Sequence, residues 1–289
     1  MSKILVTGAS GYLGAEVIKT LLREISAAQL SVLTRNEGKL NEFQSKGFNA
    51  FLGSYQDIAA LEMAMADTEA VLLISSGDQG DRVQEHKNVI ETAKKMGVKN
   101  IAYTSRCLNN SKTLVNTLMT EHFQTENYIK DSGLKYTFFR NILYMDVIPQ
   151  FIGGARALEK GIFLPAGNGK VSFALRSEMG EAMANVLLKD KFENRIYHFT
   201  GNNAYTFYDI AQVLSRISGN EVKYTNITVP DFQEIMIQRN LPPQMIQKMV
   251  AFITDIKHQQ ESKVYSDLEM QLGRKPAGLE EGLRVLFER

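Results

Sequence analysis

Six short runs of nearly continuous apolar residues recur along the first half of the chain. They occupy residues 3–7, 30–35, 49–53, 70–75, 100–105 and 135–140. A strand with one face in water alternates apolar and polar side chains, whereas a strand covered on both faces is apolar throughout. The runs therefore predict strands of a parallel sheet that is covered on both faces.

Apolar residues at helical spacing follow the first, third and fourth of these runs. They are Leu13, Val17 and Leu21, then Ile58, Leu61 and Met65, and then Val89, Ile90, Ala93 and Met96. Each set lines one side of a helix. Parallel strands that alternate with helices are joined by right-handed crossovers. This half of the chain is therefore predicted to be an α/β fold with a doubly wound parallel sheet.

The pattern changes after Tyr144. Residues 149–170 are rich in glycine and proline, which is typical of loops and turns. Further on, a helix is predicted between a cap at Thr206 and a stop at Gly219. The last helices are interrupted at Pro242–Pro243. The second half therefore lacks the regular alternation of the first.

Length and composition fit a main domain with a smaller lobe. With 289 residues, of which 44% are hydrophobic and 22% charged, the chain can bury a large core. The predicted division is a main domain at residues 1–145 and a smaller C-terminal α+β lobe at residues 146–289. One strand near residues 196–200 is expected to return to the main sheet.

Charge and cysteine content exclude several classes of protein. The formal net charge is +1 and the basic residues are scattered, which argues against nucleic-acid or anionic-membrane partners. Cys107 is the only cysteine, so no internal disulfide and no paired-thiolate metal site is expected. No apolar run approaches the ~20 residues of a membrane span, and no signal peptide precedes the first strand. We expect a cytoplasmic protein with no membrane or nucleic-acid partner, and a homodimer stays open.

Three glycines lie between the first predicted strand and the first helix. Gly8 permits a tight turn, Gly11 leaves room for a pyrophosphate, and Gly14 lets the helix lie against the sheet. The unpaired N–H groups and the dipole at a helix N-terminus stabilise an anion that can approach this closely. Glycines also simply make turns, but this position favours dinucleotide binding. The site is predicted to include the intervening residues Ser10, Tyr12 and Leu13.

The Gly-x-x-Gly-x-x-Gly spacing resembles that of extended and atypical short-chain dehydrogenases. The stretches HKNVIETAKKMGVKNIAYTS (86–105), FFRNILYMD (138–146) and LGRKPAGLEEGLRVLF (272–287) resemble the NmrA-like branch, so the resemblance covers nearly the whole chain. Within that branch, LLISS, EHFQTE and RNILY resemble bacterial type 2 NADPH:quinone oxidoreductases and triphenylmethane reductases. The resemblance implies a Rossmann fold, an NAD(P)-binding domain followed by a substrate-binding lobe, and oxidoreductase activity.

The residue at the end of the second strand predicts which dinucleotide binds. A ribose 2′-hydroxyl is usually recognised by an acidic residue about 20 residues beyond the loop. Arg35 occupies that place, and its guanidinium suits the 2′-phosphate of NADP(H). Lys39 can add a second positive charge. The alternative is a solvated surface arginine, and the sequence favours NADP(H).

Ligands of open α/β sheets bind beyond the carboxyl ends of the strands. This rule selects polar or small residues after the fourth, fifth and sixth strands: Ser75, Ser76, Gly77, Thr104, Ser105 and Asn141. Serine and asparagine are also common turn residues, so each has a structural alternative. Arg140 beside them can instead pair with a nearby carboxylate.

Most short-chain dehydrogenases carry Tyr-x-x-x-Lys on the helix after the fifth strand, with tyrosine as the proton donor. Alignment by TENYIKDSG (125–133) puts Leu118 at the tyrosine position and His122 at the lysine position. His122 either contacts the ribose or nicotinamide or is a helical histidine bonded to a neighbour. Tyr144 is the nearest aromatic hydroxyl for a substrate, unless it belongs to the core. The four histidines show no ligand spacing, so no metal site is predicted.

Three functions remain open on this evidence. The first is an NADPH-dependent oxidoreductase that passes hydride to a quinone or another electrophilic aromatic compound without the Tyr-x-x-x-Lys acid. An apolar pocket for such a substrate is predicted from Phe139, Tyr144, Ile148, Phe151 and Phe163. The second is a non-catalytic NADP(H)-binding redox sensor of the NmrA type. The third is a nucleoside-diphosphate-sugar epimerase-like protein.

Overall fold

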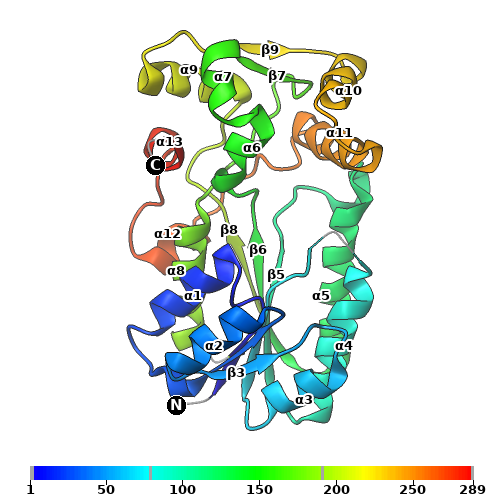
Figure 1. Cartoon of the computed structure of the whole chain (residues 1–289), viewed down its shortest axis with the longest axis vertical. Helices are drawn as coiled ribbons and strands as arrows, with labels where there is room; N and C mark the ends of the chain where they lie inside the picture. Colours follow the sequence, from blue (N-terminus) through cyan, green and yellow to red (C-terminus); the bar gives the residue numbers. More distant parts are fainter. Residues whose placement is uncertain (1–2, 78–79, 190–191, 288–289) are drawn as a thin grey trace. The chain divides into compact units, whose positions relative to one another are not determined.

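The computed structural model describes residues 3–77, 80–189 and 192–287 (Figure 1). Contacts divide the chain into two compact units. The first unit consists of Met1–Arg106, Glu121–Asn141 and Arg176–His198, and the second of Cys107–Thr120, Ile142–Leu175 and Phe199–Arg289. This division differs from the single boundary predicted at residue 145. The chain passes between the units several times, because segments far apart in sequence complete the packing of each one.

A seven-stranded sheet forms the first unit, in the order β3-β2-β1-β4-β5-β6-β8. The strands are β1 Ile4–Val6, β2 Leu30–Thr34, β3 Asn49–Leu52, β4 Ala70–Leu73, β5 Asn100–Arg106, β6 Lys135–Asn141 and β8 Arg195–Phe199. Strands β1 to β6 pair in parallel, as in Ile4 with Leu30 and with Ala70. The doubly wound parallel sheet predicted from the sequence is confirmed. Its strand order reverses between β1 and β4, which makes that place the topological switch point.

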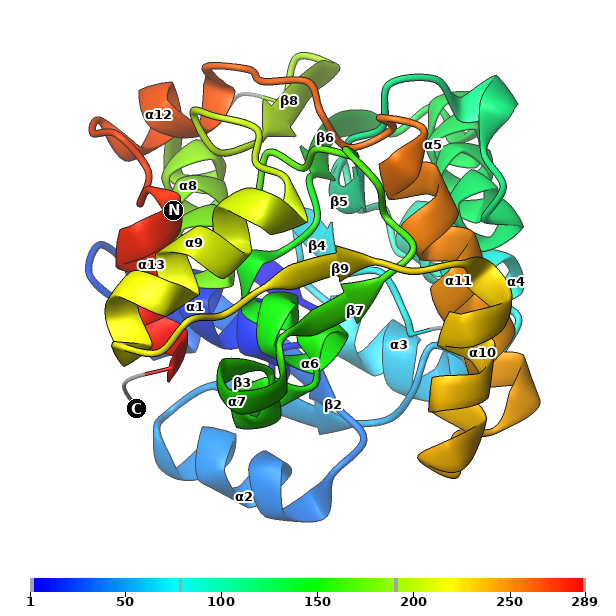
Figure 2. The same ribbon diagram turned by 90° about the horizontal axis from the view of Figure 1, so that it is seen from above.

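Helices cover both faces of this sheet. They are α1 Tyr12–Leu21, α2 Glu37–Ser45, α3 Ile58–Met65, α4 Arg82–Lys95, α5 Thr120–Ser132 and α8 Arg176–Lys189, with a short 3₁₀ turn η1 at Ala27–Gln29. Helices α1 and α8 lie on one face, and α3, α4 and α5 lie on the other (Figures 1 and 2). Crossovers to successive strands on each side of β1 produce this arrangement.

The core of the first unit explains why its strands are apolar throughout. Leu5, Val71 and Tyr103 from three neighbouring strands are buried in one cluster with residues from α3, α4 and α5. On the opposite face, α8 packs against α1 at Gly180. A Cβ atom at Gly180 would lie 2.6 Å from the Cβ of Glu16, so the close approach of the two helices requires glycine there.

The second unit contains short helices and a two-stranded parallel sheet. Its elements are η2 Ser111–Thr113, η3 Thr117–Met119, η4 Met145–Val147, α6 Ile148–Ile152, η5 Gly154–Arg156, α7 Ala157–Lys160, β7 Ile162–Leu164, α9 Phe207–Ser218, β9 Tyr224–Asn226, α10 Val229–Gln238, α11 Pro243–Lys257, α12 Asp267–Leu272 and α13 Leu279–Phe287. The predicted limits of α9 are confirmed, because Thr206 forms a capping box and Gly219 ends the helix with φ +73°. The interruption between α10 and α11 at Pro242–Pro243 is confirmed as well.

Candidate dinucleotide site

The glycine loop after β1 closes on itself at backbone distance. Gly8 has φ +61°, which favours glycine, and the N–H of Gly11 donates to its carbonyl oxygen over 3.0 Å. A Cβ atom at Gly14 would lie 2.3 Å from that same oxygen, so no side chain fits there. At Gly11 an added Cβ would meet only Gly8 O, at 3.3 Å. The loop therefore has the close packing expected at Gly8 and Gly14, while Gly11 is crowded only on the side of Gly8 O.

The residues between the glycines point in different directions. Ser10 and Tyr12 are exposed, and Leu13 is buried as part of the packing of α1. Tyr12 is 82% exposed, and the guanidinium of Arg176 lies 5.7 Å from the centroid of its ring. Arg176 is the first residue of α8, and no pattern in the sequence predicts that it approaches this loop. The N-terminus of α1 therefore has a positive charge beside it in addition to its own dipole.

Arg35 and Lys39 differ in what surrounds them. Arg35 directly follows β2 and is exposed at its carboxyl end. Lys39 lies in α2, where its ammonium group pairs with Glu42 at 2.8 Å. Hydrogen bonds from Lys39 and Lys46 lower the pKa of Glu42 to about 2. The charge of Lys39 is thus already engaged on its own helix.

Of the polar residues predicted at the later strand ends, Ser75 and Thr104 contact each other. The N–H of Ser75 donates to the Oγ1 of the buried Thr104 over 2.8 Å. Gly77 is exposed just beyond them. Asn141, the last residue of β6, is buried and pairs in register with Arg106 of β5. These residues line the carboxyl edge of the sheet, as the sequence predicted, although several hydroxyl and amide groups are already bonded within the protein.

Ser105 lies in an ion-pair cluster instead of at an open edge. Its hydroxyl donates to Glu126 over 2.6 Å. The same buried carboxylate accepts two hydrogen bonds from Arg140, at 2.8 and 2.6 Å. The alternative in which Arg140 pairs with a carboxylate is therefore the one that the structure contains. Ser105 supports this cluster with its only side-chain donor.

His122 is only 6% exposed and lies inside a polar cluster of the first unit. Its Nδ1 is 2.9 Å from the hydroxyl of Tyr103. Burial holds the pKa of His122 well below its usual value, and Arg82 and Arg106 lower this pKa further. The ring is neutral at physiological pH. This geometry agrees with the interpretation of His122 as a histidine bonded to a neighbour.

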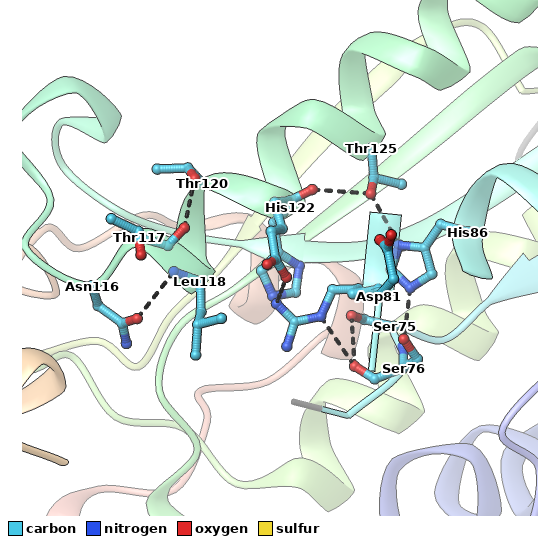
Figure 3. A network of polar contacts seen from close by, with 12 residues as sticks. Ser75, Ser76, Asp81, His86, Asn116, Thr117, Leu118, Thr120, His122 and Thr125 are labelled. Atoms are coloured by element: carbon cyan, nitrogen blue, oxygen red, sulfur yellow. Dashed lines mark hydrogen bonds and ion pairs between the residues drawn. The ribbon is translucent and has the colours of Figure 1, made fainter. Parts of the chain in front are cut away.

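Leu118 does not share a helix with His122. It lies in the 3₁₀ turn η3, and α5 begins only at Thr120. The side chain of Asn116 accepts the N–H of Leu118 over 3.2 Å at the start of this turn (Figure 3). The leucine at the family's tyrosine position therefore lies in the turn that immediately precedes the helix of His122. Asn116 caps the start of this turn, and the turn leads directly into α5 at Thr120.

The five residues of the predicted aromatic pocket differ in burial. Phe139 is fully buried in β6 and stacks on Tyr197 with a centroid distance of 6.0 Å, so it belongs to the core. Tyr144 is half-buried in the second unit, where it bridges to Ala174. The remaining three residues are also in the second unit: Ile148 is buried, Phe151 is half-buried, and Phe163 is exposed on β7. Of this set, Phe139 is the prediction that the structure contradicts.

Two residues that the sequence analysis did not select contact Ser76. The N–H of Ser76 donates to Nε2 of His86 over 3.0 Å, and Nε of Arg82 donates to the carbonyl oxygen of Ser76 over 3.2 Å. His86 Nδ1 is 3.0 Å from Oγ1 of Thr125 (Figure 3). Arg82 also pairs with Glu121 at 3.0 Å. One feature of the sequence could have selected His86: it lies three and four residues before Val89 and Ile90, and therefore on the same side of α4 as these apolar residues.

Within the described residues, no group of three or more His, Cys, Asp and Glu side chains could hold a metal ion. No helix among them is long and apolar enough to cross a bilayer. A cavity of about 890 Å³ lies within the second unit and includes Asn202, Tyr265 and Lys275 in its lining. None of the site residues predicted from the sequence lines it. The glycine loop and the strand ends of the first unit remain the candidate site.

The family model that matches this chain is that of the NmrA-like family, over residues 1–284. The chain belongs to the NmrA-like family. Quinone oxidoreductase 2 of Escherichia coli (strain K12) is 37% identical over 241 residues, which cover 83% of this chain and 82% of that protein. The NAD(P)H azoreductase of Xenophilus azovorans is 27% identical over 249 residues, covering 85% of this chain and 84% of that protein. The family resemblance seen in the sequence is confirmed.

Solved structures of NmrA-like proteins agree with the fold. An NADPH-dependent quinone oxidoreductase of Escherichia coli in complex with NADPH superimposes with a TM-score of 0.91 at 33% identity, covering 98% of this chain and 99% of that one. The triphenylmethane reductase of Citrobacter sp. in complex with NADP(H) superimposes with a TM-score of 0.90 at 31% identity, with the same coverage. The architecture of this NmrA-like chain is therefore shared with proteins whose structures contain the dinucleotide.

Proposed function

We propose that this protein is an NADPH-dependent oxidoreductase that transfers hydride to a quinone or a similarly electrophilic aromatic acceptor. The observation that carries the proposal is the glycine loop, which packs at backbone distance and opens α1 at the switch point of the sheet. Relatives described as a quinone oxidoreductase, a triphenylmethane reductase and an NAD(P)H azoreductase support the class of acceptor.

The residues of the loop fit a dinucleotide. The first turn of α1 presents unpaired N–H groups, and the open space at Gly11 admits a pyrophosphate. Arg176 beside Tyr12 adds positive charge at this end of the helix. Arg35 at the end of β2 suits the 2′-phosphate, which favours NADPH over NADH. The bound cofactor supplies the hydride, and these residues hold and orient it.

The proposed reaction needs no strong general acid from the protein. None of the eleven tyrosines is followed by lysine four residues later. Reduction of a quinone gives an oxygen whose conjugate acid resembles a phenol, with a pKa of about 10, so water can protonate it. A neutral, buried His122 bonded to Tyr103 fits a supporting role better than that of an acid. Proximity and orientation of the two reactants then supply most of the rate.

A non-catalytic NADP(H) sensor is the second candidate function, favoured by the same lack of a Tyr-x-x-x-Lys pair. Such a protein would bind the cofactor and turn over no acceptor. The epimerase-like alternative is weaker, because oxidation and reduction of a sugar hydroxyl rely on that acid–base pair. A likeness of 19% identity to a structure described as a nucleoside-diphosphate-sugar epimerase concerns the fold alone.

The test combines binding with turnover. NADPH and NADH are titrated into the purified protein, and NADPH oxidation is then followed with a quinone, a triphenylmethane dye and an azo dye. A Gly11→Val variant, which is expected to lose cofactor binding, serves as the matched control. Turnover by the wild type alone supports the proposal, while tight binding without turnover of any acceptor favours the sensor. If the wild type binds neither dinucleotide, both functions are wrong.

A further inference from the structure

Two side chains of one helix bind both polar backbone groups of Ser76. Arg82 and His86 are four residues apart and therefore lie on the same side of α4. Arg82 donates to the carbonyl oxygen of Ser76, and His86 accepts its N–H (Figure 3 shows the second contact). A peptide segment whose donor and acceptor are both bound cannot rotate freely. We call Arg82 and His86 together the α4 clamp.

The α4 clamp acts at the switch point of the sheet. Ser76 follows β4, and β4 is the neighbour of β1 on the side where the strand order reverses. A Cβ atom at Gly8 would lie 3.1 Å from the Cβ of Ile74, so the chain leaving β4 borders the glycine loop. The hydroxyl of Tyr55 joins the two sides, since it lies 2.7 Å from both Thr7 Oγ1 and Ile74 O. Ser76, two residues after Ile74, thus belongs to the wall beside the glycine loop.

The hydrogen-bond directions around His86 follow from its partners. A backbone N–H can only donate, so Nε2 of His86 must be the acceptor for Ser76. In a neutral ring the proton is then on Nδ1, which donates to Thr125 Oγ1, and that hydroxyl donates to the carbonyl oxygen of Glu121. Each hydrogen bond in this series therefore has one donor and one acceptor, with no conflict among them. The ring is fully buried and cannot turn to another partner.

We propose that His86 is a positioning residue for cofactor binding, acting through the N–H of Ser76. The inference rests on the proposed dinucleotide function and assigns to His86 a role at the same site. His86 touches no reacting group. Its effect is to fix the peptide of Ser76 at the wall beside the glycine loop, so that the segment 75–77 is already in its binding conformation when the cofactor arrives.

A pair of variants separates the two hydrogen bonds of His86. In His86→Gln the longer side chain places its amide oxygen near the position of Nε2, so Ser76 keeps an acceptor. In His86→Asn the shorter side chain reaches the position of Nδ1, which keeps a contact with Thr125 and leaves Ser76 N–H without its partner. Gln84→Ala, on the exposed side of α4, is the control for changes in the helix itself.

The measurements are the Kd for NADPH, kcat and KM with a quinone, the melting temperature, and hydrogen exchange at the Ser76 amide. His86→Asn is expected to raise Kd and KM for NADPH about 10-fold, with kcat at saturating NADPH changed less than about 3-fold. His86→Gln and Gln84→Ala should stay within about 3-fold of the wild type. Exchange at Ser76 should be slow in the wild type without cofactor and faster in His86→Asn.

Three results would overturn the inference. One is an NADPH affinity in His86→Asn equal to that of His86→Gln and the wild type. Another is an equal loss of affinity, kcat and melting temperature in both histidine variants, which would indicate a purely structural role. If His86→Asn does not fold, fast exchange at Ser76 in the cofactor-free wild type contradicts the clamp, and slow exchange supports it. A wild type that fails to bind NADPH contradicts the proposed function itself, before any variant is compared.

Discussion

The loop after β1 and the segment after β4 border the same place in the sheet, yet they are held by different means. The glycine loop takes its shape from its own residues, because Gly8 and Gly14 allow a backbone conformation and a contact that other residues do not. The segment at Ser76 takes its shape from Arg82 and His86, two side chains of the following helix. The first wall of the site, the glycine loop, therefore depends on residues without side chains. The second wall, the segment at Ser76, depends on hydrogen bonds from side chains.

The largest expected effect comes from adding a side chain to the glycine loop. Gly11→Val should abolish measurable NADPH binding, since a branched side chain would occupy the space left for the pyrophosphate. The fold should survive, because Gly11 has an extended conformation that any residue can adopt, and an added Cβ would be tight only against Gly8 O, at 3.3 Å. Calorimetric titration and thermal unfolding measure the two quantities. Gly14→Ala is the contrasting control and should lower the melting temperature, because its Cβ would clash with Gly8 O. Retained NADPH affinity in Gly11→Val would contradict the placement of the site.

The next effect concerns the phosphate rather than either wall. Arg35→Glu should weaken NADPH binding relative to NADH by roughly 1.5–3 kcal/mol, on the order of 10–100-fold, because it replaces a charge-assisted pair with repulsion. Lys39→Ala is the matched control and should change this preference little, since Lys39 already pairs with Glu42. Competitive titrations of both dinucleotides measure the preference. A preference unchanged in Arg35→Glu would move the phosphate contact to another residue.

Low pH should weaken the hold of His86 on the segment at Ser76, whereas the glycine loop has no titrating group of this kind. Burial, with a further contribution from Arg82, lowers the pKa of His86 to about 3, whereas an unfolded histidine has a pKa of about 6.5. Because the unfolded chain takes up the proton first, this contribution to stability is complete above pH 6.5 and is lost as the pH falls toward 3, by up to about 1.4 kcal/mol per pH unit. Denaturant unfolding at several pH values measures the slope. His86→Gln should unfold with a shallower dependence, and an identical slope in that variant would contradict the assignment.

A smaller effect on catalysis is expected at the other buried histidine. His122→Ala should lower the rate of hydride transfer less than the ~10²–10⁴-fold typical of a lost general acid. It should reduce the free energy of unfolding by about 1–3 kcal/mol, because the hydroxyl of Tyr103 loses its hydrogen bond to this ring. Single-turnover NADPH oxidation with a quinone at saturating cofactor provides the test. A decrease of about four orders of magnitude would identify His122 as an acid.

The smallest expected change probes the hydroxyl of Ser76. Its Oγ is buried and has no hydrogen-bond partner within the part of the chain that the structure describes. Ser76→Ala should weaken NADPH binding by about 3-fold if rotation of this hydroxyl brings it to the cofactor. Stability without cofactor should stay the same or rise, because an unsatisfied buried group is removed. Lower stability together with unchanged affinity would show that Ser76 Oγ serves the fold instead.

The difference between the walls also explains what sequence analysis could predict. Helical and strand periodicity identified the sheet, because each strand carries its own burial pattern. The glycine loop was recognisable for a similar reason, since Gly8, Gly11 and Gly14 are neighbours in sequence and their backbone requirements are local. Arg35 could be placed from its distance to the loop, because the length of α1 and the following strand fixes that spacing.

Contacts between distant segments could not be predicted in this way. The bond between Ser105 and Glu126 joins β5 to α5, and the contact between His86 and Ser76 depends on how α4 turns back toward the strand end. In each case the role of a polar side chain depends on which neighbour the fold brings to it.

The packing of α1 against α8 at Gly180 has a consequence for synthesis of the protein on the ribosome. Helix α1 leaves the ribosome early, but the surface that it buries against α8 has no partner until residues 176–189 have been synthesised. Strand β8 is added to the sheet later still. The nascent N-terminal segment therefore exposes apolar surface through more than half of translation, and a fragment truncated at residue 145 should be aggregation-prone for the same reason.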